Sequence, residues 1–188
     1  MTKMKVVPVK VPWMISPSHD FASFAGYEVE EVSVEVLCGF NKKRYNNVMS
    51  KLQEQYGEDI PDDEYNKAGN AIIKITFQPI CLFTMYGKME GYERYDFSML
   101  DQYYDGRLSF RGEWDKTDVC PNPGFYEVVE SSVKEAFGFT SPRVKHWVLC
   151  GHDSCIDVLA YSFEWEEIEW GMSSLERMTE SSHGIYQI

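Results

Sequence analysis

The sequence lacks the short motifs that mark the common enzyme chemistries. It contains no Walker A loop, no dinucleotide-binding glycine fingerprint, no GxSxG nucleophile elbow and no HExxH helix. It also lacks any run of about 18 apolar residues, the length that a membrane-spanning helix needs. The usual sequence evidence for nucleotide-driven reactions, for the common hydrolases and for a membrane span is therefore missing.

Positive charge is scarce in this chain. Its 188 residues include 18 Lys and Arg against 30 Asp and Glu, which gives a formal net charge of -12. This balance repels phosphate backbones and anionic lipids, so it disfavours nucleic acid and membranes as partners. It is compatible with high solubility, with a protein partner that carries basic groups, or with mimicry of a nucleic acid.

Cysteine is sparse and irregularly spaced. The five cysteines are Cys38, Cys81, Cys120, Cys150 and Cys155. An odd, irregular set argues against the disulfide framework of a secreted protein. The N-terminal segment has no uninterrupted apolar stretch of signal-peptide length, because prolines divide it. The sequence therefore predicts an intracellular, cytoplasmic protein with mostly buried, reduced thiols.

Apolar periodicity predicts one globular α+β domain over residues 1–188, with residues 171–188 as a peripheral or frayed tail. Helical spacing favours helices over residues 41–57 and 122–138. Alternating runs around Asp105-Gly106 favour a hairpin. We expect a largely antiparallel sheet of about five to seven strands, with two main helices packed on one face.

A second hairpin is predicted over residues 143–165, where two apolar runs flank the polar turn from Gly151 to Ser154. Because apolar residues fill both faces of both runs, we expect two central strands. A turn of this length sets a testable register, which pairs Cys150 with Cys155, Val148 with Asp157, and His146 with Leu159.

The turn of this second hairpin is the strongest candidate for chemistry. It gathers Cys150, His152, Asp153 and Cys155 within six positions. A thiol nucleophile would need His152 as its base and an aspartate to orient that base. A structural interpretation is favoured over catalysis, because buried thiols are usually inert and Asp and Ser side chains cap turns.

The same turn is the candidate metal site. Cys150, His152 and Cys155 supply ligand types that zinc accepts, although their spacing matches no known zinc pattern. A fourth ligand would come from elsewhere in the chain, for instance Cys120, His19 or Asp20. The main expectation is that the protein has no cofactor, and zinc or another divalent metal is the alternative.

An acidic, aromatic segment near the C-terminal end is the candidate partner-binding surface. It consists of Glu164, Trp165, Glu166, Glu167, Glu169 and Trp170. Aromatic side chains anchor many protein interfaces, and clustered carboxylates attract basic partners. The competing interpretation is that these charges protect an edge strand from aggregation.

Three functions remain open from the sequence. The leading one is a non-enzymatic binding or regulatory protein, of the inhibitor or immunity kind, that acts on a protein partner. The alternative is a metal- or thiol-dependent hydrolase centred on Cys150, His152, Asp153 and Cys155. The third is a subunit of a homo-oligomeric assembly.

Overall fold

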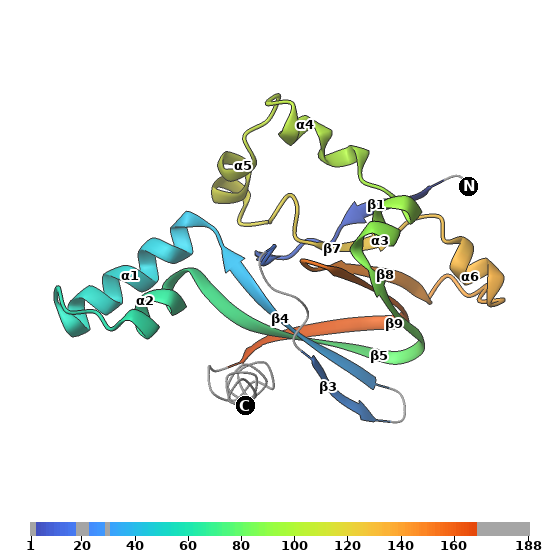
Figure 1. Ribbon diagram of the computed structural model, residues 1–188, viewed down its shortest axis with the longest axis horizontal. Coiled ribbons are helices and arrows are strands. Elements are labelled where there is room, and N and C mark those ends of the chain that lie inside the picture. Colours follow the sequence, from blue (N-terminus) through green and yellow to red (C-terminus); the bar gives the residue numbers. More distant parts are fainter. Residues whose placement is uncertain (1–2, 18–22, 29–30, 169–188) are drawn as a thin grey trace, which may run out of the picture.

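The computed structural model describes residues 3–17, 23–28 and 31–168 (Figure 1). Within these residues, nine strands form one sheet. The strands are β1 (Met4–Pro8), β2 (Trp13–Ile15), β3 (Ser23–Glu28), β4 (Glu31–Phe40), β5 (Asn70–Gly87), β6 (Tyr95–Asp96), β7 (Phe125–Val128), β8 (Lys145–Cys150) and β9 (Ser154–Ile168). The helical segments are α1 (Lys42–Tyr56), α2 (Asp62–Gly69), α3 (Lys88–Arg94), the 3-10 turn η1 (Ser98–Leu100), α4 (Asp101–Tyr104), α5 (Phe110–Thr117) and α6 (Ser132–Ala136).

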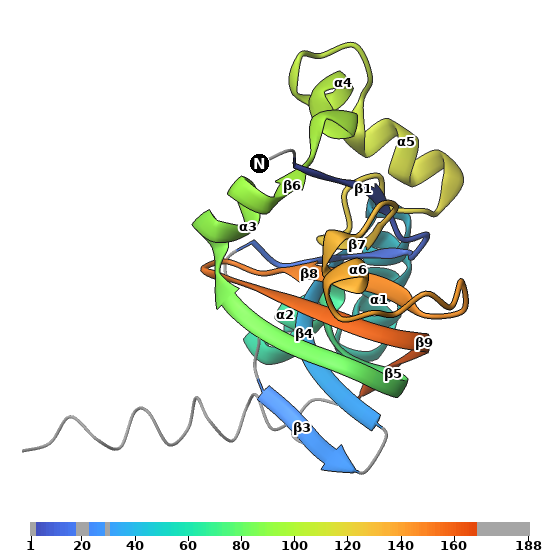
Figure 2. The same ribbon diagram turned by 90° about the vertical axis from the view of Figure 1, so that its right-hand side faces the viewer.

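The sheet runs in the order β2-β4-β5-β9-β8-β7-β1-β6, with β3 paired to β4. Neighbouring strands are antiparallel except for β1 and β6, which are parallel. Figure 1 shows the long strands β5 and β9 crossing the middle of the sheet, with α1 and α2 at one end and α6 at the other. Figure 2 shows α4 and α5 projecting beyond β1. The expected α+β class and largely antiparallel sheet are confirmed.

The predicted counts of strands and helices are wrong. The sheet has more strands than the expected five to seven, and short helices occupy several connections between them. The helices lie at different ends of the sheet instead of packing together on one face (Figure 1). Short strands such as β2 and β6 carry too few residues to show a period in the sequence.

Aromatic side chains dominate the main core. The ring of Phe125 stacks on Trp13 at 6.1 Å between centroids, and meets Phe163 edge-to-face at 4.9 Å. Phe77 and Trp147 also contact Phe125, at 6.0 and 5.8 Å. Because these residues come from five different strands, their packing joins segments that lie far apart in the sequence.

Two sequence-predicted elements are confirmed. Helix α1 begins after Asn41, whose side chain accepts a hydrogen bond from the Arg44 backbone N–H at 3.0 Å, and ends at Gly57 with φ of 68°. The β8–β9 hairpin has the predicted register, in which Cys150 faces Cys155 and Val148 faces Asp157. Both hairpin strands lie inside the sheet, as expected for runs that are apolar on both faces.

The helix predicted over residues 122–138 is wrong. Strand β7 occupies its first part, between β1 and β8, and only α6 is helical. Phe125 and Tyr126 are buried in two different hydrophobic clusters, so both faces of this strand are covered. Pairing with β8 therefore overrides a helical spacing of apolar residues. Phe137, one of the apolar residues in the segment predicted to be helical, is 61 % exposed.

The hairpin predicted around Asp105-Gly106 is also wrong. Gly106 does adopt a positive φ of 76°, but the turn links α4 to α5. The Asp105 carboxylate accepts a hydrogen bond from the Arg107 N–H at 3.0 Å, and the Ser109 hydroxyl caps α5 by accepting from the Gly112 N–H at 3.1 Å. These local side-chain bonds favour a helix-to-helix connection over strand pairing.

Candidate functional site

The tip of the β8–β9 hairpin carries two of the predicted site residues. The Gly151 N–H donates to the Ser154 carbonyl at 2.9 Å and closes the turn. His152 Nδ1 lies 2.9 Å from Asp153 Oδ1, and both side chains are exposed. The backbone carbonyl of Asp153 accepts from the Lys88 N–H at 2.8 Å, which joins the tip to α3. His152 and Asp153 thus pair with each other at the surface.

The two predicted thiols lie one step below this tip, on opposite strands. The Sγ atoms of Cys150 and Cys155 are 3.2 Å apart and share a hydrogen bond. When Cys155 ionises, its thiolate accepts a hydrogen bond from Cys150, and this bond lowers the pKa of Cys155. When Cys150 ionises, it can no longer donate that bond, and this loss and burial raise the pKa of Cys150. The nearest partner of each thiol is therefore the other thiol, an arrangement suited to thiol–disulfide chemistry.

Metal-ligating side chains do not cluster in the part of the chain that the structure describes. There, no group of three or more His, Cys, Asp or Glu side chains could hold a metal ion. Cys120, predicted as a further ligand, is fully buried, and burial raises its pKa to about 12. His19 and Asp20 lie outside the described residues.

A buried polar cluster around Asp157 was missed by the sequence analysis. Asp157 is only 2 % exposed, and its Oδ1 accepts hydrogen bonds from the hydroxyls of Tyr86 at 2.6 Å and Tyr95 at 2.7 Å. The Arg94 guanidinium lies 3.5 Å from Oδ2. Burial and the charge of Asp157 raise the pKa of both tyrosines, so both remain hydrogen-bond donors.

His146 extends this cluster to Ser131. The Ser131 hydroxyl accepts from the Lys134 N–H at 3.0 Å and lies 2.7 Å from His146 Nδ1. An imidazole proton on Nε2 would face the Asp157 carboxylate, and in this tautomer Nδ1 accepts the proton of the Ser131 hydroxyl. Nε2 faces the Tyr95 hydroxyl at 3.4 Å and Asp157 Oδ1 at 3.6 Å. The result is a relay of polar groups from Ser131 to Asp157.

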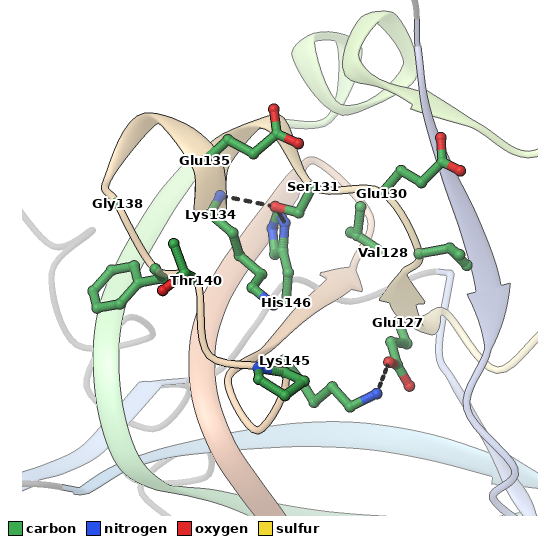
Figure 3. Close-up of a pocket in the computed structure, with 13 residues that line it drawn as sticks. Glu127, Val128, Glu130, Ser131, Lys134, Glu135, Gly138, Thr140, Lys145 and His146 are labelled. Atoms are coloured by element: carbon green, nitrogen blue, oxygen red, sulfur yellow. Dashed lines mark hydrogen bonds and ion pairs between the residues drawn. The ribbon is translucent and has the colours of Figure 1, made fainter.

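Ser131 and His146 contribute to the lining of a cavity of about 580 Å³ (Figure 3). Lys134 from α6 and Lys145 from β8 also line it. The Lys145 ammonium donates to the Glu127 carboxylate at 2.6 Å on the cavity wall. One sequence signal pointed here: His146 and Asp157 are polar residues inside apolar strand runs, and the predicted register put them on adjacent strands. Their partners, far away in the sequence, gave no signal.

The acidic segment occupies the outer half of β9. Trp165 is 39 % exposed, and Glu166 and Glu167 are exposed at 65 % and 45 % of their side chains. Two chain cations lie nearby: Lys74 is 3.7 Å from Glu166, and Arg44 is 2.6 Å from Glu167. Glu169 and Trp170 lie outside the described residues.

Strand pairing leaves this half of β9 with one neighbour. β9 pairs with β5 from Ser154 to Ile168, whereas its pairing with β8 ends at Ala160. Among the described residues, no strand pairs with residues 161–168 on the β8 side. This open side is called the β9 edge below.

Comparison with known protein families, with curated proteins and with solved structures finds no match for this chain. Within the described part of the chain, no helix is long and apolar enough to cross a membrane.

Proposed function

We propose that the protein acts by binding a protein partner at the β9 edge. The partner supplies an extended segment that carries Lys or Arg and pairs with residues 161–168 as an additional strand. Main-chain hydrogen bonds give such a complex its affinity, and alternate side chains give it specificity. The observation that carries this proposal is that, among the described residues, β5 is the one strand that pairs with residues 161–168, so backbone donors and acceptors face the other side.

Charge supports a basic partner. Glu164, Glu166 and Glu167 are exposed on this half of β9, in a chain whose net charge is -12. Strand geometry places Glu164 and Glu166 on one face of the sheet and Glu167 on the other. A Lys- or Arg-bearing strand laid along the edge would meet carboxylates on both faces. Acidic fields of this kind raise association rates and discriminate against acidic competitors.

Trp165 supplies the aromatic anchor of the proposed surface. It is partly exposed, and its inner side packs edge-to-face on the buried Trp13 at 5.9 Å. A tryptophan held in this way loses little conformational freedom on binding, which is typical of residues that dominate interface energy.

The test is a quantitative capture experiment with the full chain. Wild type, the double variant Glu164→Lys/Trp165→Ala and the control Glu58→Lys, whose glutamate is exposed in the turn after α1, are immobilised and exposed to cell extract at low and high salt. Wild type and control should retain the same basic proteins in a salt-sensitive manner. The double variant should retain at least about tenfold less of them, equivalent to about 1.4 kcal/mol.

Equal retention by wild type and the double variant would refute the β9 edge as the binding surface. Light scattering on the same proteins gives the second readout. A stable wild-type oligomer that the double variant dissociates would assign the edge to self-association and remove the partner proposal.

One observation favours a second candidate function, the hydrolysis of an ester or amide. The Ser131 hydroxyl lies 2.7 Å from His146 Nδ1 beside a cavity, a geometry that suits the nucleophile–base pair of acyl transfer. Ser131 would attack the carbonyl carbon, and His146 would pass the serine proton to the leaving group. Water would then cleave the acyl-serine, which releases the acid and restores the Ser131 hydroxyl.

A fluorophosphonate probe tests this second candidate, because it labels serines that an adjacent base activates. Labelling should map to Ser131 and should be lost in His146→Gln. The variant Ser132→Ala, at the neighbouring exposed serine, should label normally. Absence of labelling in folded wild type would leave the cluster with a purely structural role.

A further inference from the structure

We propose that Cys150 and Cys155 form a redox-active pair, which a hydroperoxide converts into an intramolecular disulfide across the β8–β9 hairpin. The proposal is independent of partner binding at the β9 edge. It rests on the backbone register of the hairpin, on the positions of the two sulfur atoms and on the different environments of the other three cysteines.

Backbone geometry suits a disulfide at this position. Cys150 and Cys155 are direct cross-strand partners. The Cys150 N–H donates to the Gly124 carbonyl at 2.7 Å, on the side away from β9. The two cysteines are therefore a non-hydrogen-bonded pair, in which antiparallel strands bring their Cα atoms to about 4.5 Å. Disulfides span Cα separations of about 4.4 to 6.8 Å, so the bond needs little backbone movement.

The sulfur atoms already face each other. They are 3.2 Å apart as free thiols, and an S–S bond of about 2.05 Å would need a shift of about 1 Å. Cys155 is buried beneath α3, where a Cβ added to Gly91 would lie 2.6 Å from its Sγ. Cys150 is partly exposed, so the proposed oxidant, which must be little larger than water, would approach the buried Cys155 sulfur from that side.

The chemistry assigns one role to each thiol. The Cys150 hydrogen bond lowers the pKa of Cys155, and the nearby Lys88 ammonium acts in the same direction. The Cys155 thiolate is therefore the nucleophile. It attacks one peroxide oxygen, the O–O bond breaks, and the released hydroxide takes a proton to leave as water, which gives a sulfenic acid at Cys155.

Cys150 then resolves the sulfenic acid. Its sulfur attacks the Cys155 sulfur, the S–O bond breaks, and the hydroxide leaves as a second water with the Cys150 proton. Two thiols and one hydroperoxide thus give one disulfide and two oxygen-bearing products, water or an alcohol. Each sulfur loses one electron, and the peroxide gains two.

The other cysteines provide internal controls. Cys38 and Cys120 are fully buried, and burial raises the pKa of both thiols. Burial also raises the pKa of Cys81. A thiol that remains protonated reacts slowly with peroxide. Oxidation of the folded protein should therefore consume two of the five thiols first.

The experiment treats the folded, reduced full chain with a small excess of hydrogen peroxide and then alkylates it in denaturant. Digestion with trypsin and with a protease that cleaves before aspartate separates residues 146–152 from residues 153–156. A linked pair of these peptides, two hydrogens lighter than their sum, is the expected product. The thiol count should fall from five to three, and Cys81→Ser should form the same link at the same rate.

Single variants test the two roles. In Cys150→Ser, dimedone should trap a sulfenic acid at Cys155, because the serine hydroxyl still donates to the thiolate. In Cys155→Ser, the protonated Cys150 should give at least about tenfold less adduct. The proposal is overturned if folded wild type keeps all five thiols under these conditions, or if Cys38, Cys81 or Cys120 is oxidised before the 150–155 link forms.

Discussion

The indole of Trp165 packs edge-to-face on the indole of Trp13, with ring centroids 5.9 Å apart and planes at 82°. Trp13 is fully buried in the main core, whereas Trp165 is 39 % exposed. This contact joins the proposed binding surface to the main hydrophobic core. Trp165 is therefore held in place before a partner binds, which reduces the conformational entropy lost on binding at the β9 edge.

Two substitutions of Trp165 measure how much its ring contact with Trp13 contributes to the free energy of unfolding. Trp165→Ala should lower the free energy of unfolding by about 1–2 kcal/mol, because it removes the aromatic contact and part of the buried surface. Trp165→Phe keeps an aromatic ring against Trp13 and should lose less than half of that amount. Urea unfolding measures both changes, and equal losses in the two variants would contradict a stabilising ring contact.

Gly91 is required by the close approach of α3 to β9. An alanine Cβ would lie 2.6 Å from the Cys155 Sγ, so Gly91→Ala should destabilise the protein by about 1–2 kcal/mol despite its better helix propensity. Gly87→Ala, in open space at the start of the same helix, should change stability by less than about 0.5 kcal/mol.

A double-mutant cycle identifies the atom responsible. In a Cys155→Ala background the obstructing sulfur is gone, so the cost of Gly91→Ala should fall by at least about 1 kcal/mol. Additive effects of the two substitutions would show that the clash is absent.

The tyrosine hydroxyls on Asp157 should contribute measurably to stability. Tyr95→Phe removes a 2.7 Å hydrogen bond to a buried carboxylate and should cost about 1.5–3 kcal/mol. Tyr56→Phe, at an exposed position at the end of α1, should change stability by less than about 0.5 kcal/mol. Similar free energies of unfolding for the two variants would contradict a stabilising role for the cluster.

Stability should fall at alkaline pH. Burial raises the pKa of Cys120 from 9.0 to about 12, and the pKa values of Tyr86 and Tyr95 lie above their ordinary 10.0. Above pH 9 the unfolded chain loses protons that the folded protein retains. Each such proton lowers the free energy of unfolding by about 1.4 kcal/mol per pH unit, whereas below pH 9 this contribution is fully present.

Urea unfolding under reducing conditions, at pH values from about 8 to 11, measures this dependence. The double variant Tyr86→Phe/Tyr95→Phe should show a shallower decline above pH 10 than Tyr56→Phe. A free energy of unfolding that stays constant up to about pH 11 would contradict the prediction.

Sequence patterns correctly predicted the elements that depend on residues close together in the chain. The β8–β9 hairpin followed from two apolar runs around Gly151, and α1 followed from its apolar stripe and from Gly57. The sequence pattern gave the wrong structure around Phe125. The apolar residues there fit both a helix with one buried face and a strand buried on both faces. Only pairing with β8, a long-range contact, distinguishes the two structures.

The candidate sites differ in the same way, because one is formed by residues close in the sequence and the other by residues far apart. The turn was found because Cys150 and Cys155 are close in the sequence. The Asp157 cluster was missed because Tyr86, Tyr95 and Ser131 reach it from distant segments. Polar residues inside the apolar strands β8 and β9 were the one visible signal, and a buried carboxylate needs partners that a strand pattern does not reveal.

Hydrogen exchange is the most direct test of the proposed function. A basic protein recovered by wild type is added to the full chain, and amide exchange is followed by mass spectrometry. Binding as an additional strand predicts slower exchange at residues 161–168, in wild type and Glu58→Lys alike. Protection elsewhere, with residues 161–168 exchanging as in the free protein, would contradict the account.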